Sequence, residues 1–166
     1  MLEKFQIPGV AAIIERNIDG EKHILMQERV TPSRPEETGL LEIPAGKIRQ
    51  FENLFDTLRR EVKEETGLTV TSITEEADAQ QLSMPNYQVL SCEPYCIGQN
   101  ISGHYPILVI TFLCRATGTL LKQSEETNNI RWIALKQLAD IINETPEQLY
   151  PMHIYALKKY FRQQLD

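Results

Sequence analysis

The sequence predicts an α+β protein, an α/β/α sandwich in which helices flank a mixed β-sheet. Short runs of β-branched and apolar residues recur along the chain, and residues 52–66 and 146–164 show amphipathic helical spacing. Strands and helices do not alternate strictly, which argues against a purely parallel sheet. The 166 residues, with 42% hydrophobic content, suit one core, so we expect a single domain over residues 1–166.

The first third of the chain predicts a hairpin, a loop and a short strand. Residues 10–16 and 23–30 are apolar and β-branched, and Asp19-Gly20 between them is a strong hairpin signal. Residues 31–39 form a polar, proline-bearing loop, a type that often surrounds active sites. Residues 40–46, LLEIPAG, then predict a short strand that ends at Pro44 in a tight turn.

The middle of the chain predicts one helix and two strands. Apolar residues recur at spacings of three and four between positions 51 and 62, which predicts a helix from about 52 to 66. Gly67 supplies the stop signal after it. Residues 68–77 resemble a strand, and residues 87–97 a second one that Pro94 ends or bends.

The last third predicts a buried strand, a second short strand and two helices. Residues 105–118 are the most hydrophobic run, and their β-branched content indicates a strand covered on both faces. A short strand at 128–135 leads into a helix at 136–143. The amphipathic stretch 146–164 then predicts the final helix, packed on the sheet or used as a dimer face.

Composition excludes several classes of function. The net charge of −6 gives no electrostatic footprint for nucleic acid, and no segment approaches the ~20 apolar residues of a membrane span. We therefore expect neither nucleic-acid nor membrane partners. Three cysteines without a CxxC pair favour a reducing cytoplasm, and three scattered histidines make a zinc site improbable.

The helix at 52–66 carries negative charge at an unfavourable end. Its inward stripe runs through positions 54, 58, 61 and 65, so it begins with two leucines and ends with Glu61 and Glu65. Glu64 lies beside them. Helix carbonyls already place about half a negative charge at this end, which disfavours further anions. A solvated acidic face is the common explanation for such a cluster, but these acids continue the core stripe instead of opposing it.

A divalent cation would remove this conflict. Clustered carboxylates raise one another's pKa unless a positive charge compensates them. A hard cation with oxygen ligands does so, and Mg²⁺ fits best because it binds a few carboxylates together with substrate phosphates.

The segment 46–68, GKIRQFENLFDTLRREVKEETGL, resembles the Nudix box of the Nudix, or MutT-like, hydrolases. It matches the pattern of Gly, five residues, Glu, seven residues, then Arg-Glu-aliphatic-any-Glu-Glu-any-Gly-aliphatic. So many fixed identities over 23 residues are strong support. The resemblance implies a loop-helix-loop on an α/β/α sandwich and the hydrolysis of nucleoside diphosphates linked to a moiety X.

The resemblance also implies roles for individual residues. Glu61, Glu64 and Glu65 would hold Mg²⁺ or Mn²⁺, joined by a backbone carbonyl near position 45 or 46. Arg60 would orient a catalytic glutamate, most simply Glu61. The remaining box residues would support this machinery: Glu52 as a brace, Gly46 for close backbone approach, and Gly67 for the sharp turn after the helix.

A glutamate outside the box often assists catalysis in this family. Glu125 and Glu126, in the loop SEETNN, are the nearest candidates by position, and we take Glu126 as the better one. An exposed turn is the alternative explanation for both. Arg34 in the proline-bearing loop could contact phosphate. The aromatic residues that could stack a base are Tyr87, Tyr95, Tyr105 and Trp132.

The substrate class remains open between alternatives. The LEIPAGKI entry to the box resembles the branch that cleaves ADP-ribose and related nucleotide sugars, and Pro85 lies where that branch has a proline. Only 45 residues precede Gly46, which equally suits a MutT-like nucleoside triphosphate pyrophosphohydrolase. A non-catalytic Nudix-fold ligand sensor is a third alternative, although such proteins usually have damaged boxes. A homodimer is possible.

Overall fold

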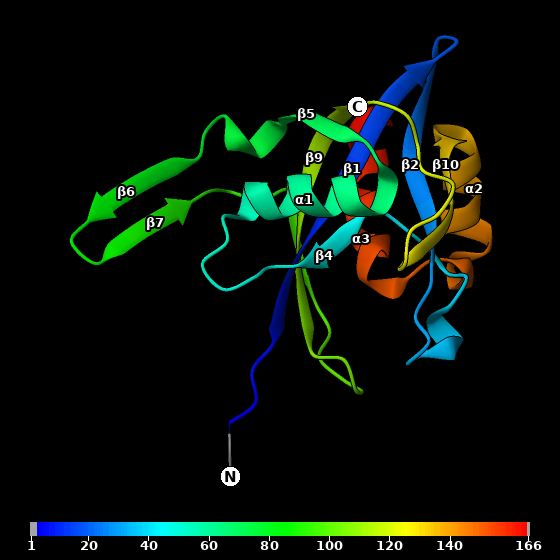
Figure 1. Cartoon of the computed structure of the whole chain (residues 1–166). Coiled ribbons are helices and arrows are strands. Elements are labelled where there is room, and N and C mark those ends of the chain that lie inside the picture. Colours follow the sequence, from blue (N-terminus) through cyan, green and yellow to red (C-terminus); the bar gives the residue numbers. More distant parts are fainter. Residues whose placement is uncertain (1–2, 166) are drawn as a thin grey trace.

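The computed structural model describes residues 3–165 and shows a central sheet between helices (Figure 1). This confirms the predicted α+β fold class. In chain order the elements are β1 (Ile7–Ile18), β2 (Glu21–Arg29), β3 (Leu41–Glu42), β4 (Ala45–Lys47), α1 (Leu54–Thr66), β5 (Thr69–Ile73), β6 (Gln80–Met84), β7 (Tyr87–Ser91), β8 (Cys96–Gln99), β9 (Ile107–Thr117), β10 (Thr127–Ala134), α2 (Leu135–Glu144) and α3 (Pro151–Leu165). Short 3₁₀ turns occupy Pro35–Glu37, Thr74–Glu76 and Pro146–Gln148.

The sheet is mixed, as predicted. Its strand order is β10-β2-β1-β9-β5, with β3 beside β2, β4 beside β1 and β8 beside β9. The pair β1–β9 is parallel and the other pairs are antiparallel. The β1–β2 hairpin turns at Asp19 and Gly20, both with positive φ, as the Asp-Gly signal predicts. The hydrophobic run at 105–118 forms β9 near the centre of the sheet.

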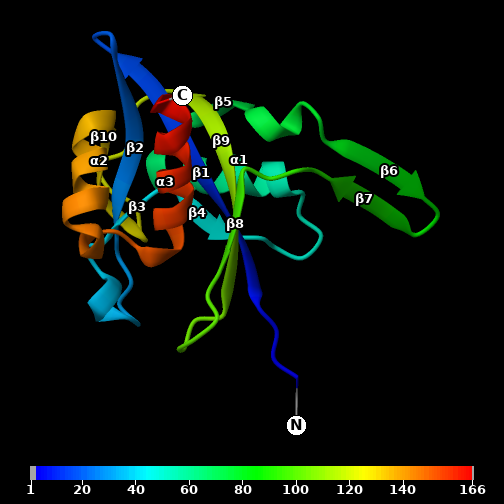
Figure 2. The same ribbon diagram turned by 180° about the vertical axis from the view of Figure 1, so that it is seen from behind.

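Two apolar clusters cover the two faces of the sheet. Alternate residues of β1 point to opposite sides, so Val10 and Ala12 pack with Leu58 of α1, while Ala11 and Ile13 join the cluster that contains α2 and α3. Figure 2 shows α3 and α2 on the face opposite α1. Helices therefore cover both faces of the sheet, and α1 packs against β1 and β4.

Several predicted boundaries differ from the structure. Helix α1 begins at Leu54 instead of position 52, because Asn53 caps it. The strand predicted over 68–77 ends at Ile73, and the predicted 40–46 strand is divided into β3 and β4 around Pro44. Because proline has no N–H to donate to a ladder, the chain leaves β2 there and pairs with β1.

The segment 87–97 is two strands rather than one. Strand β7 pairs only with β6, which the sequence analysis did not predict, and β8 pairs with β9 after the chain passes Pro94. The β6–β7 hairpin projects from the body in both views (Figures 1 and 2). Within residues 3–165, no helix is both long and apolar enough to cross a membrane.

Candidate active site

Helix α1 is fixed at both ends by its own sequence. The Asn53 side chain accepts a hydrogen bond from the backbone N–H of Phe55 at 2.8 Å, which caps the first turn. At the other end Gly67 adopts a left-handed conformation with φ of 80°, and its N–H donates to the Lys63 carbonyl. The helix is thus terminated directly after the glutamates.

The inward stripe predicted through positions 54, 58, 61 and 65 of α1 is confirmed in part: Leu58 and Glu65 are buried, whereas Leu54 and Glu61 are half-buried. Phe55, Leu58 and Val62 are buried against the sheet, and the Phe55 ring meets Phe112 of β9 edge-on at 5.4 Å. Glu61 and Glu65 lie one and two turns after Leu58 on the same side of the helix. Since the apolar turns fix the rotation of the helix, these carboxylates are directed toward β1 and β4 instead of solvent.

Glu65 is the most deeply placed acid of the box. Its side chain is 5% exposed, and one carboxylate oxygen accepts hydrogen bonds from Gln27 Nε2 at 2.8 Å and from the Ala45 N–H at 3.0 Å. Burial raises its pKa well above the usual value, and the neighbouring charges of Glu42 and Glu61 add to this rise. A buried carboxylate with neutral donors and two anionic neighbours is short of positive charge.

Glu61 lies against bare backbone at Gly46. A Cβ atom at position 46 would lie 1.9 Å from Glu61 Cδ, so any side chain there would collide with the carboxyl group. This explains the glycine that begins the box. Burial raises the pKa of Glu61, with the charges of Glu64 and Glu126 adding to the rise and Arg60 opposing it.

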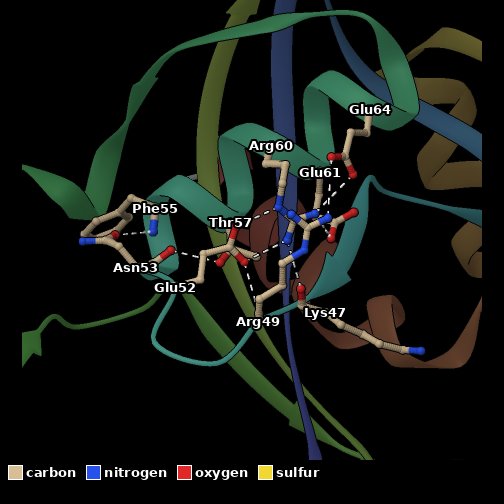
Figure 3. Close-up of polar contacts among 9 residues, drawn as sticks. All are labelled: Lys47, Arg49, Glu52, Asn53, Phe55, Thr57, Arg60, Glu61 and Glu64. Atoms are coloured by element: carbon tan, nitrogen blue, oxygen red, sulfur yellow. Dashed lines mark hydrogen bonds and ion pairs between the residues drawn. The ribbon is translucent and has the colours of Figure 1, made fainter.

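The Arg60 side chain donates hydrogen bonds to three glutamates of the box (Figure 3). Its Nε and Nη2 atoms donate to the two oxygens of Glu52 at 2.7 and 2.8 Å, and Nη1 donates to Glu61 at 2.5 Å and to Glu64 at 3.2 Å. Nη2 also donates to the Lys47 carbonyl at 3.2 Å. The hydrogen bonds from Arg60 lower the pKa of Glu52 to about 2. Arg60 is therefore a positioning group whose fork is held by Glu52.

The box carboxylates Glu61, Glu64 and Glu65 all line one cavity of about 1000 Å³. Glu126, from the loop before β10, and its neighbour Glu125 line the same cavity, as do the backbone positions Ala45 and Gly46. The charge of Glu126 raises the pKa values of both Glu42 and Glu61, which places Glu126 near the acids of the box. The structure thus brings the predicted glutamates and their predicted backbone partner together.

The donor set fits a hard divalent cation. Three box carboxylates line the cavity, and within residues 3–165 Glu65 forms no ion pair with a cationic side chain. Among residues 3–165, no three His, Cys, Asp or Glu side chains already form a complete metal cluster. Arg60 donates hydrogen bonds to Glu61 and Glu64, so a metal would bind by sharing or replacing those hydrogen bonds.

Two residues near the box were missed by the sequence analysis. Gln27 is fully buried on β2 and bonds Glu65, and Glu42 on β3 pairs with Arg29 at 2.6 Å. Burial raises the pKa of Glu42 to about 7, against the opposing charge of Arg29. Both interrupt apolar runs, ILMQ and LLEIP, and a polar residue inside a buried strand is the signal that could have found them.

Of the remaining candidates for phosphate contact or base stacking, some line the cavity and others do not. Arg34 and Tyr105 line the cavity, so the expectation for these two fits their placement. The other proposed stacking residues do not line it: Tyr87 is on the projecting hairpin, Tyr95 is buried beneath Lys159, and Trp132 lies under Arg16. Pro85 is in the turn between β6 and β7, away from the cavity lining.

A mixed sheet clamped between helices, with a buried acidic helix end above a glycine, defines a Nudix-type site, and sequence comparison agrees. Residues 6–153 match the NUDIX domain family. The chain therefore belongs to the NUDIX family, whose members are pyrophosphohydrolases.

The individual proteins that resemble this chain share only a modest fraction of its sequence. The NAD-capped RNA hydrolase NUDT12 of Homo sapiens is 26% identical over 133 residues, which is 80% of this chain and 23% of the relative, so the chain spans about a quarter of its length. The MutT protein of Methanosarcina mazei Go1 superposes with a TM-score of 0.67 at 23% identity and covers 100% of both chains. The NUDIX domain of Shewanella oneidensis NrtR, solved with ADP-ribose, gives a TM-score of 0.66 at 18% identity, over 99% of this chain and 91% of that one.

Proposed function

We propose that this protein hydrolyses the diphosphate linkage of a nucleoside diphosphate joined to a moiety X, with Mg²⁺ or Mn²⁺ as cofactor. The observation that carries this proposal is the buried Glu65 carboxylate, which faces Glu61 and Glu42 without a cationic partner of its own. Such a group costs stability unless it binds a cation.

The residues that would hold the metal are Glu61, Glu64 and Glu65, with the carbonyl of Ala45 or Gly46. When bound, the cation would neutralise phosphate oxygens and lower the pKa of a nearby water. A water oxygen attacks one phosphorus of the diphosphate and the P–O anhydride bond breaks, which gives a nucleoside monophosphate and phospho-X. Positioning and charge stabilisation supply most of the catalysis in such a displacement.

The other side chains of the site have separate roles in the reaction. Arg60, braced by Glu52, holds the Glu61 carboxylate in place through the 2.5 Å hydrogen bond. Glu61 accepts the proton that the attacking water loses. Glu126 assists from the opposite loop, because it lines the same cavity and its charge is felt by Glu61. Gln27 and the Ala45 N–H fix the orientation of Glu65.

ADP-ribose or a related nucleotide sugar is the substrate we favour. The LEIPAGKI entry to the box supports it, and the NrtR domain with this fold was solved with ADP-ribose. The cavity of about 1000 Å³ has room for a whole nucleotide sugar. A nucleoside triphosphate is the second candidate, supported by the fold that the chain shares with a MutT protein. The three free thiols support a cytoplasmic location.

Product analysis tests this function. The protein is incubated with ADP-ribose, other nucleotide sugars, dinucleotides and nucleoside triphosphates, each with Mg²⁺ or Mn²⁺. ADP-ribose should give AMP and ribose 5-phosphate, whereas a triphosphate substrate would give inorganic pyrophosphate. If no member of the panel is cleaved with either metal, the proposed activity is wrong and a ligand-sensing role becomes the better hypothesis.

A further inference from the structure

The cavity of the box also contains a cationic group that the reaction above does not use. Arg34, Lys47 and Tyr105, here called the Tyr105 group, come from the β2–β3 loop, β4 and the segment before β9. The guanidinium carbon of Arg34 lies 3.9 Å from the centre of the Tyr105 ring, and the Lys47 ammonium lies 5.9 Å from it. Two positive charges are thus held near one aromatic ring.

Neither cation is fully compensated by protein carboxylates. Arg34 has one distant partner, Glu37 at 3.5 Å, which it shares with Arg29, and its Nη1 atom is buried without a hydrogen-bond partner. Lys47 takes part in none of the ion pairs found among residues 3–165. Figure 3 shows its side chain directed away from Glu52, Glu61 and Glu64.

A second, independent observation comes from buried polar atoms. His153, at the start of α3, is 1% exposed and lines the cavity, yet neither ring nitrogen has a hydrogen-bond partner. The Nε atom of Arg29, another lining residue, is also buried without one. Buried polar groups are nearly always hydrogen-bonded in folded proteins. Arg29, Arg34 and His153, which is neutral and so has one N–H donor, therefore leave nitrogen atoms unpaired beside the cavity, which indicates that a polar ligand with acceptor atoms completes this part of it.

The charge of the ligand group can be argued from the charge of its site. A phosphate monoester carries about −1.5 to −2 at neutral pH and offers three acceptor oxygens, which matches two cations and several unpaired N–H donors. A carboxylate would balance only one of the two cations. Arginine gives a planar fork and lysine a point charge, and both are common phosphate ligands.

We propose that Arg34 and Lys47, with Arg29 and His153 behind them, bind a phosphate monoester of the substrate that lies outside the diphosphate being cleaved. The inference rests on the proposed function and narrows its substrate class: the preferred substrate is a nucleoside diphosphate derivative that carries an additional phosphomonoester. Unphosphorylated ADP-ribose would then be a poorer substrate than its phosphorylated counterpart.

Matched pairs of compounds test this proposal. ADP-ribose is compared with ADP-ribose 2′-phosphate, and dephospho-coenzyme A with coenzyme A, because each pair differs by one phosphomonoester. We expect the phosphorylated member of at least one pair to have a kcat/KM about tenfold higher, through a lower KM. R34Q and K47Q should remove that preference by raising the KM of the phosphorylated member to that of the unphosphorylated one. K136Q, an exposed lysine outside the cavity, is the matched control.

A binding measurement separates this inference from the activity. Titration calorimetry without divalent metal compares AMP with adenosine 2′,5′-bisphosphate and adenosine 3′,5′-bisphosphate, on wild type, R34Q, K47Q and K136Q. At least one bisphosphate should bind about tenfold more tightly than AMP, except to R34Q and K47Q. If R34Q does not fold, K47Q carries the test, because Lys47 is exposed.

The outcomes are distinguishable. If nothing in the panel is hydrolysed but the bisphosphate preference is present and depends on Lys47, the proposed function fails and the phosphate site stands. If both members of every pair are hydrolysed equally, and R34Q slows both equally, the Tyr105 group serves the scissile diphosphate. That result would overturn the inference and leave the hydrolase function intact.

Discussion

Two groups of side chains face one cavity, and they differ in charge and in how they are held. The box carboxylates Glu61, Glu64 and Glu65 come from two turns of one helix and are positioned by its buried apolar face. The Tyr105 group gathers single residues from three separate segments. The difference teaches that a local sequence pattern can specify a charged cluster on a helix, whereas a cluster assembled across a sheet depends on topology.

The largest expected effect lies at the acidic end. E61Q and E65Q should each lower kcat by on the order of 10²–10³, because each removes a carboxylate that would hold the cation stabilising the reacting phosphate. Steady-state kinetics on whichever substrate the panel identifies measures this. E21Q, an exposed glutamate on β2, is the control and should retain wild-type turnover. Full activity of E65Q would show that its buried carboxylate has no part in the reaction.

Metal binding should stabilise the wild type more than a box variant. A ligand that binds only the folded state at 100 times its Kd adds about 2.7 kcal/mol. Saturating Mg²⁺ should therefore raise the midpoint of thermal unfolding of the wild type, and by much less in E65Q. Differential scanning calorimetry with Mg²⁺ against EDTA checks this. Equal shifts in the two proteins would place the ion elsewhere.

Substitutions of the two loop glutamates, Glu125 and Glu126, should have different effects on kcat. Both line the cavity, and the charge of Glu126 raises the pKa values of Glu42 and Glu61. E126Q should therefore lower kcat by about tenfold, while E125Q changes it by less than about twofold. A larger loss in E125Q than in E126Q would reverse this assignment.

The smallest effect is a gain in stability. Burial raises the pKa of Glu65 in the folded protein, so its charged form destabilises the fold, and this contribution is relieved only as pH falls through the folded pKa. Without metal at pH 7 to 8, E65Q should be more stable than the wild type by on the order of 1 kcal/mol. Below the ordinary glutamate pKa of about 4.3, which applies to the unfolded chain, the two should converge. Urea unfolding in EDTA at several pH values measures this, and a less stable E65Q at pH 8 would contradict it.

The placement of the box glutamates at the end of one helix could be predicted from the sequence because that information is local. The stripe through Leu54, Leu58, Glu61 and Glu65 predicted the burial of Glu65, with Glu61 half-buried beside it, and the box pattern contains the Gly46 that lies against Glu61. Gln27 and Glu42 were missed because their role depends on how β2 and β3 meet the helix, which no spacing encodes. The convergence of Arg34 and Lys47 on Tyr105 likewise depends on strands that pair across long sequence separations.

The strand predictions failed where a proline separates two pairing partners. Residues 87–97 are continuous in composition, yet β7 belongs to the projecting hairpin and β8 to the main sheet. The apolar and β-branched residues on both sides of Pro94 satisfy the same pattern. Only the partner strand distinguishes them, and that partner, β9, follows later in the chain.

A crystal grown with Mn²⁺ tests the central claim most directly. Anomalous difference maps collected at the manganese edge should show at least one ion between Glu61, Glu65 and the Ala45–Gly46 backbone, with the Arg60 hydrogen bonds to Glu61 or Glu64 shared or replaced. Maps that show no ion there while manganese sits only on exposed carboxylates, or nowhere, would contradict the account.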